Sequence, residues 1–145
     1  MIALASDHAG FQYKEDIKNL LESLQESYKD FGTTSTEPTD YPDYANTAAE
    51  AIARGECDRG IMVCGSGIGM DIVANKSKGI RAALCTTVEM ARLSRSHNDA
   101  NVLVLGERLT DWQTVEQIVR VWLRTKFEGG RHDRRVKKIH SLTHL

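Results

Sequence analysis

A cysteine at the start of a glycine-rich segment is the feature of this sequence with the most chemistry to offer. Cys64 follows the apolar run Ile61-Met62-Val63 and precedes a segment, from Gly65 to Gly69, in which every second residue is glycine. Because glycine has no Cβ, backbone amides in such a segment can approach an anion closely. The following residues predict a helix, whose N-terminus favours negative charge, including the thiolate form of cysteine. The segment indicates either a nucleophile or base beside an anion site, or a buried cysteine before an ordinary turn.

Acidic and imidazole groups that could exchange protons lie in two other places. Asp7 and His8 follow a short apolar run at the N-terminus. His97 lies within the polar cluster Ser96-His97-Asn98-Asp99, just before another apolar run. Both sites offer a base or an acid for proton transfer.

The C-terminal segment is basic, although the whole chain has a formal net charge of only −1. From position 131 onward there are five Lys or Arg and one Asp, so this segment carries +4 and the remainder −5. Arg131 and Arg135 are four residues apart, share one face of a helix and can bind one phosphate; Arg108 is a further candidate. Composition leaves open a nucleic-acid arm, a solvated helix face and a site for a small anion.

The spacing of these residues argues against several familiar sites. Met70 stands where a dinucleotide fingerprint has its third glycine and where a cysteine phosphatase has its arginine. A phospho-acceptor receiver needs an acid in place of Cys64 and a lysine in place of Gly106. The histidines lie on separate segments, unlike the ligands of a zinc hydrolase. A thiolate with backbone donors, a histidine and arginines suits aldose-ketose isomerisation, in which a base moves a proton and an enediolate is stabilised.

Composition predicts an ordinary soluble protein. The 145 residues, 41% of them hydrophobic and 27% charged, suffice for one domain with its own core. Asp7 and His8 lie only a few residues from the N-terminus, so we expect no signal peptide there. No apolar stretch approaches the roughly 18 residues of a membrane span, and we expect a cytoplasmic protein. Cys57, Cys64 and Cys85 form no C-x-x-C pair, which favours reduced thiols.

Short apolar runs alternate with helical patterns along the chain, and a basic helix is expected from about Arg131. This alternation predicts a single α/β domain over residues 1–145: a doubly wound, Rossmann-like, three-layer αβα fold with a five-stranded parallel sheet in the order 2-1-3-4-5. Ligands of such a fold bind beyond strands 1 and 3, whose ends carry Asp7-His8 and Cys64-Gly65, and this favours the functional interpretation of Cys64. The predicted strands are 2–5, 28–31, 61–64, 80–85 and 102–105.

Seven motifs, in order and over nearly the whole chain, resemble those of the type B ribose-5-phosphate isomerases and the related galactose- and allose-6-phosphate isomerases. They lie at 6–10, 40–42, 64–69, 74–76, 79–82, 94–101 and 128–132.

The resemblance implies an enzyme of the pentose phosphate pathway that interconverts D-ribose 5-phosphate and D-ribulose 5-phosphate without metal or cofactor. Cys64 would be the base that moves a proton between C2 and C1, and His97 would assist opening of the furanose ring. The other implied site residues are Gly65, Ser66, Gly67, Ile68 and Gly69 at the enediolate, Asp7, His8, Tyr41 and Asn98 at the sugar oxygens, and Arg108, Arg131 and Arg135 at the phosphate.

Some positions refine this resemblance. Cys64 together with Met70 is typical of the subgroup whose base is cysteine rather than a glutamate after the third loop glycine. Ser66 keeps the hydroxyl of the threonine found in many members. Asp71 stands at a position where other members of the family commonly have a small or polar residue. Either capping of the helix or an effect on Cys64 would account for this difference.

The resemblance also implies a homodimer, with a tetramer as the alternative, whose active sites are shared between chains. The expected partner is a phosphorylated sugar, and neither nucleic acid nor membrane. Galactose 6-phosphate and allose 6-phosphate are alternative substrates. A non-catalytic phosphosugar-binding protein, or a nucleic-acid binder using the basic end, is the alternative from another class.

Overall fold

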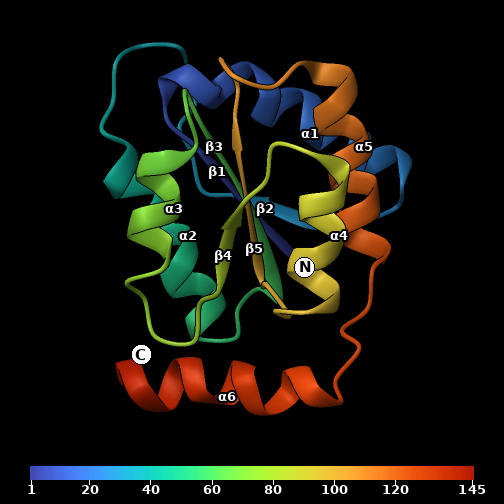
Figure 1. Ribbon diagram of the computed structural model, residues 1–145. Coiled ribbons are helices and arrows are strands. Elements are labelled where there is room, and N and C mark those ends of the chain that lie inside the picture. The colour runs from blue at the N-terminus through green and yellow to red at the C-terminus, as the bar shows by residue number, and fades with distance from the viewer.

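Five parallel strands form the centre of the computed structural model, which describes residues 1–145 (Figure 1). β1 lies between β2 and β3, and β5 lies between β3 and β4. All four neighbouring pairs are parallel, so the carboxyl ends of the strands meet at one edge of the sheet. The strands are β1 (Ile2–Ser6), β2 (Tyr28–Asp30), β3 (Arg59–Cys64), β4 (Ala82–Leu84) and β5 (Val102–Gly106).

The order of the last two strands corrects the predicted 2-1-3-4-5 to 2-1-3-5-4. All five residues of β5 are buried, as is typical of a strand covered on both faces, whereas the three residues of β4 are only half-buried. A short, less apolar strand is suited to the edge of a sheet, and the longer apolar strand to its interior. β1 and β3 are neighbours as expected, so the crevice at their carboxyl ends is retained.

Helices cover both faces of the sheet and give the predicted three layers (Figure 1). α2 and α3 pack on one face, and α1, α4 and α5 pack on the other, while α6 crosses below the amino ends of the strands. None of the helices combines the length and apolarity needed to span a bilayer. The helices are η1 (His8–Gly10), α1 (Phe11–Ser23), α2 (Tyr41–Ala53), α3 (Ile68–Ala74), α4 (Val88–Ser96), α5 (Trp112–Arg124) and α6 (Arg131–Thr143).

Alternate residues of each strand enter two separate cores. Ile2 and Leu4 of β1 pack toward α1 and α5, whereas Ala3 and Ala5 pack toward α2. The α2 residues that join the second core are largely alanines as well, so small side chains on both elements let helix and sheet approach closely. Cys64 belongs to this second core and lies at its upper end, where β3 meets the loop before α3.

Asn75, the C-cap of α3, covers the free edge of β4. Asn75 accepts a hydrogen bond from the Ala82 amide at 2.8 Å and donates one to the Ala82 carbonyl at 3.1 Å. One turn earlier, burial raises the pKa of Asp71, and the backbone amide of Leu84 acts in the opposite direction. Asp71 therefore faces the edge strand, and its Oδ1 is buried without a hydrogen-bond partner.

Candidate active site

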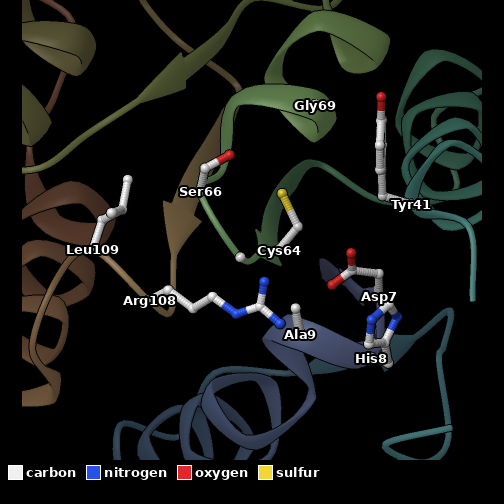
Figure 2. Close-up of a pocket in the computed structure, with 10 residues that line it drawn as sticks. Asp7, His8, Ala9, Tyr41, Cys64, Ser66, Gly69, Arg108 and Leu109 are labelled. Carbon is white, nitrogen blue, oxygen red and sulfur yellow. The ribbon is translucent and has the colours of Figure 1, made fainter. Parts of the chain in front are cut away.

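A cavity of about 340 Å³ opens at the carboxyl ends of β1 and β3 (Figure 2). This is the crevice in which doubly wound folds bind ligands. Eight expected site residues line the cavity, and they are Asp7, His8, Tyr41, Cys64, Gly65, Ser66, Gly69 and Arg108. Ala9 and Leu109 complete the lining, and Gly67 and Ile68 belong to the same loop without lining it.

Cys64 is 4% exposed, yet it lines the cavity. Its Sγ accepts a hydrogen bond from the Gly67 amide at 3.2 Å, and such a donor stabilises negative charge on sulfur. Gly67 has a φ of +80°, and a Cβ at this position would lie 2.5 Å from a methyl group of Leu84 and 3.0 Å from the Leu105 backbone. The turn that directs this amide at Cys64 therefore requires glycine.

Two other glycines let side chains from distant elements close over the loop. A Cβ on Gly69 would lie 2.6 Å from the ring of Tyr41, the first residue of α2. A Cβ on Gly65 would lie 3.3 Å from an Arg108 nitrogen. The absence of side chains at these positions thus gives the cavity an aromatic wall and a cationic wall.

Asp7 and His8 are held by backbone contacts. Asp7 Oδ1 accepts a hydrogen bond from the Gly10 amide at 3.1 Å, which caps η1. His8 Nδ1 accepts a hydrogen bond from the Thr39 amide at 3.0 Å. The proton of the neutral ring therefore lies on Nε2, which remains a hydrogen-bond donor. A substrate oxygen in the cavity would meet a carboxylate and an imidazole N–H side by side.

Arg108 lies on the segment that follows β5. Its backbone amide donates to the Gly65 carbonyl at 3.0 Å, and the amide of Glu107 donates to the Cys64 carbonyl at 2.9 Å. The Arg108 guanidinium and the Asp7 carboxylate are turned toward each other across the cavity (Figure 2). These two hydrogen bonds hold the segment that carries Arg108 against the residues at the end of β3. The positions of Arg108 and Cys64 in the cavity are therefore fixed relative to each other.

Glu107 was missed by sequence reasoning. Its carboxylate accepts the Tyr13 amide at 2.7 Å and so ties α1 to the rim of the cavity. Burial raises the pKa of Glu107, and the hydrogen bond from Tyr13 acts in the opposite direction. The only sequence signal was its position next to Arg108.

The remaining expected residues lie at the other end of the molecule. His97 and Asn98 follow α4 at the amino end of β5, and Arg131 and Arg135 lie on α6, which crosses that end (Figure 1). β3 and β5 pair from Gly60–Val102 to Cys64–Gly106, and four residue steps along a strand span roughly 13 Å. Within one chain, these four residues therefore do not reach the cavity at Cys64.

His97 stacks on His132, with ring centroids 4.2 Å apart and an interplanar angle of 13°. His132 is the one buried residue of α6. Glu128 Oε2 lies 3.7 Å from His132 Nε2 and 4.0 Å from His97 Nε2. Burial lowers the pKa of His132, and the positive charges of His97 and Arg131 act in the same direction while Glu128 opposes them. His132 is not among the site residues expected from the sequence, although it ends the last of the seven motifs, at 128–132.

A second contact attaches α6 to its own chain. Arg81 lies just before β4, and its Nη2 donates to the Asp99 carbonyl at 2.7 Å. Arg81 Nη1 lies 2.8 Å from His140 Nε2 on α6. His97, Asp99 and α6 therefore form one connected surface at the amino end of the sheet.

The parallel sheet with its ligand crevice beyond β1 and β3 makes this protein a member of the doubly wound α/β class. The family model for Ribose/Galactose Isomerase matches residues 2–139. Ribose-5-phosphate isomerase B of Escherichia coli is 47% identical over 138 residues, which cover 95% of this chain and 93% of the relative. The chain belongs to the Ribose/Galactose Isomerase family, a family of enzymes, and this confirms the resemblance found in the motifs.

Solved structures support the fold over the full length. Ribose-5-phosphate isomerase B of Clostridium thermocellum has a TM-score of 0.97 at 49% identity and covers 99% of this chain and 97% of its own. The enzyme of Mycoplasma genitalium, solved with bound ribulose 5-phosphate, has a TM-score of 0.94 at 38% identity. The match covers 99% of this chain and 95% of the M. genitalium chain. The five-stranded α/β fold is thus that of ribose-5-phosphate isomerases of type B.

Proposed function

We propose that this protein interconverts D-ribose 5-phosphate and D-ribulose 5-phosphate, with Cys64 as the base and without a metal ion. The observation that carries the proposal is the Cys64 sulfur, which lines a cavity of ligand size and accepts a backbone N–H. The names of the E. coli and C. thermocellum relatives support the choice of substrate.

The proposed proton transfer follows from the position of the sulfur. The Cys64 thiolate removes the proton from C2 of the open-chain aldose, and the electron pair of that C–H bond forms the C1–C2 double bond. The carbonyl oxygen on C1 then carries the negative charge, which amides of the loop from Gly65 to Gly69 and the Ser66 hydroxyl can stabilise. The hydroxyl proton on C2 passes to the oxygen on C1, and return of the proton from the Cys64 thiol to C1 regenerates the thiolate and leaves a carbonyl at C2, which is the ketose.

We further propose that two copies of the chain form each complete site. Cys64 and His97 lie at opposite ends of the same sheet, so a second copy must supply His97 and Asn98 if these residues act at the cavity. Large apolar side chains are exposed where such a copy could pack, both near the cavity and on α6. These residues are Ile68, Ile72, Leu109, Ile139 and Leu142.

The arginines fit the same arrangement. Arg108 lines the cavity, whereas Arg131 and Arg135 lie on α6. The nearby acids contact other side chains: Glu128 lies near His132, and Asp133 pairs with Lys137. Three guanidiniums from two chains would then surround the phosphate, each able to form charge-assisted hydrogen bonds. In the same arrangement His97 of the second copy reaches the ring oxygen and assists opening of the furanose.

The test is a coupled assay with ribose 5-phosphate, galactose 6-phosphate and allose 6-phosphate at equal concentrations. We expect kcat/KM to be highest for ribose 5-phosphate and activity to survive exhaustive chelation. Preference for a six-carbon substrate would replace the proposed substrate. Tight binding of all three without turnover would indicate a phosphosugar-binding protein instead. Loss of activity on chelation, with recovery on addition of one metal, would contradict the metal-free mechanism.

A further inference from the structure

We propose that His97, Glu128 and His132 form a binding site for a divalent cation of the zinc class. The site joins the end of α4, the segment before α6 and the first turn of α6. We infer in addition that occupation of the site inhibits isomerisation, and this second part rests on the proposed function.

The three residues offer the ligand atoms that zinc prefers. Each presents one atom, an imidazole nitrogen or a carboxylate oxygen, and all three atoms lie within 4.8 Å of one another. The distances from Glu128 Oε2 to the two Nε2 atoms, 3.7 and 4.0 Å, exceed hydrogen-bond length. The three polar ends therefore lie together without satisfying one another, and a cation would bind all three.

Closing the cluster around an ion requires the ligand atoms to approach one another and the rings to turn. Ligand distances of about 2.0–2.1 Å in tetrahedral geometry place ligand atoms roughly 3.4 Å apart. The two nearly parallel rings must also turn, because a metal lies in the plane of each imidazole it binds. In the single chain His97 is 36% and Glu128 56% exposed, so packing within the chain leaves both side chains free to move toward the buried His132.

Neighbouring charges limit the strength of the site. Arg131 and Arg135 flank His132, and their positive charges repel a cation, whereas the single carboxylate of Glu128 attracts it. With three protein ligands, the fourth position stays open to water. We therefore expect reversible binding that is weaker than that of a closed structural zinc site.

Binding at this cluster would remove the His97 nitrogen from proton exchange. A lone pair bound to a metal accepts no proton, so the imidazole could not assist opening of the furanose ring. The proposed inhibition follows from this competition and does not require the cation to touch Cys64.

Co²⁺ is the probe for binding, since its absorption spectrum reports nitrogen, oxygen and sulfur ligands. We expect one Co²⁺ per chain in the full-length protein, displaced by Zn²⁺, with no thiolate-to-cobalt charge-transfer band. Glu128→Gln and His132→Gln should each weaken binding by at least about tenfold, whereas Asp133→Asn, a neighbouring carboxylate outside the cluster, should not. Circular dichroism checks that all variants are folded.

Equal Co²⁺ affinity in all of these variants would overturn the proposed site. So would a thiolate-to-cobalt charge-transfer band that disappears in Cys64→Ser, because the ion would then be bound by Cys64.

A second measurement tests inhibition. Zn²⁺ should inhibit the isomerase reversibly, chelation should restore activity, and Glu128→Gln should need about tenfold more Zn²⁺ for the same inhibition. Binding without inhibition would overturn the inhibitory role alone. An inactive metal-free protein that still binds Co²⁺ would overturn the proposed function and support the site.

Discussion

The backbone amide of Gly67 lies 3.2 Å from the Cys64 sulfur and donates a hydrogen bond to it. The donor comes from a turn that only glycine adopts without strain, and the acceptor is the last residue of β3. Cys57 and Cys85 are also buried, but neither lines the cavity. Among the three thiols, only Cys64 combines a backbone donor with access to a ligand.

Removal of this thiol should abolish turnover while leaving the fold and phosphosugar binding intact. For Cys64→Ala we expect kcat to fall by about 10²- to 10⁴-fold, the usual contribution of a general base, with little change in substrate affinity. Steady-state kinetics and calorimetric titration measure the two quantities. Cys57→Ala is the matched control and should keep its kcat. Near-normal turnover in Cys64→Ala would remove this residue from the mechanism.

Thiol reagents should distinguish the cysteines. Burial raises the pKa of Cys85 to about 11, so this thiol stays protonated and unreactive at neutral pH. We expect iodoacetamide at pH 7.5 (about one pH unit below a free thiol's pKa) to modify Cys64 first, with parallel loss of activity and protection by ribose 5-phosphate. Peptide mass spectrometry identifies the modified residue. Modification of Cys85 ahead of Cys64 would contradict this expectation.

Mixed dimers can test whether sites are shared. Cys64→Ala and His97→Ala should each have low activity alone, because every site lacks one group. After dissociation and reassociation together, heterodimers should contain one intact site, built from the native Cys64 of one chain and the native His97 of the other. Recovery of activity is the expected result. No recovery, despite heterodimers shown by native mass spectrometry, would mean that each site comes from one chain.

The phosphate arginines should affect substrate affinity more than kcat. Loss of a hydrogen bond to a charged group costs about 1.5–3 kcal/mol, so Arg131→Ala should raise KM by roughly 10- to 100-fold. Lys138→Ala, an exposed cation on the same helix, is the control and should leave KM unchanged. An unchanged KM in Arg131→Ala would assign Arg131 to the solvated surface.

A buried ion pair beneath η1 and α1 should dominate the acid stability. Lys14 is 1% exposed, and its Nζ lies 2.6 Å from both oxygens of Asp30 and 2.7 Å from the Thr33 carbonyl. Asp30→Asn would leave the buried ammonium group with Glu15, 3.7 Å away, as its nearest carboxylate, and we expect a loss of about 3 kcal/mol in the free energy of unfolding. Lys14→Met keeps the volume and should cost less.

The pH dependence of this pair has a definite sign. Burial raises the pKa of Asp30, but hydrogen bonds from Lys14 and Gly32 outweigh it and leave the pKa below its ordinary value. The folded state thus favours the carboxylate, so its contribution is present above about pH 4 and is lost as pH falls through the folded pKa. Urea unfolding between acidic and neutral pH should show this loss in the wild type and a flatter profile in Asp30→Asn.

Local patterns in the sequence were enough to predict the elements and the place of the cavity at the ends of β1 and β3. Apolar runs and glycines predicted that Asp7, His8 and Cys64 follow strands, and parallel strands bring such ends to one edge. The pairing of β1 with β3 then places all three residues at one cavity. These inferences succeeded because each depends on neighbours in the sequence and on one rule of parallel sheets.

Only the tertiary structure decided the order of β4 and β5, the separation of His97 from Cys64 and the stacking of His97 on His132. Residues 97 and 132 are far apart in the chain, and no spacing rule relates them. Which strand takes the sheet interior, and where a terminal helix docks, depends on how the whole chain buries its apolar surface. That competition is global, whereas the sequence signals of strands, turns and helix starts are local.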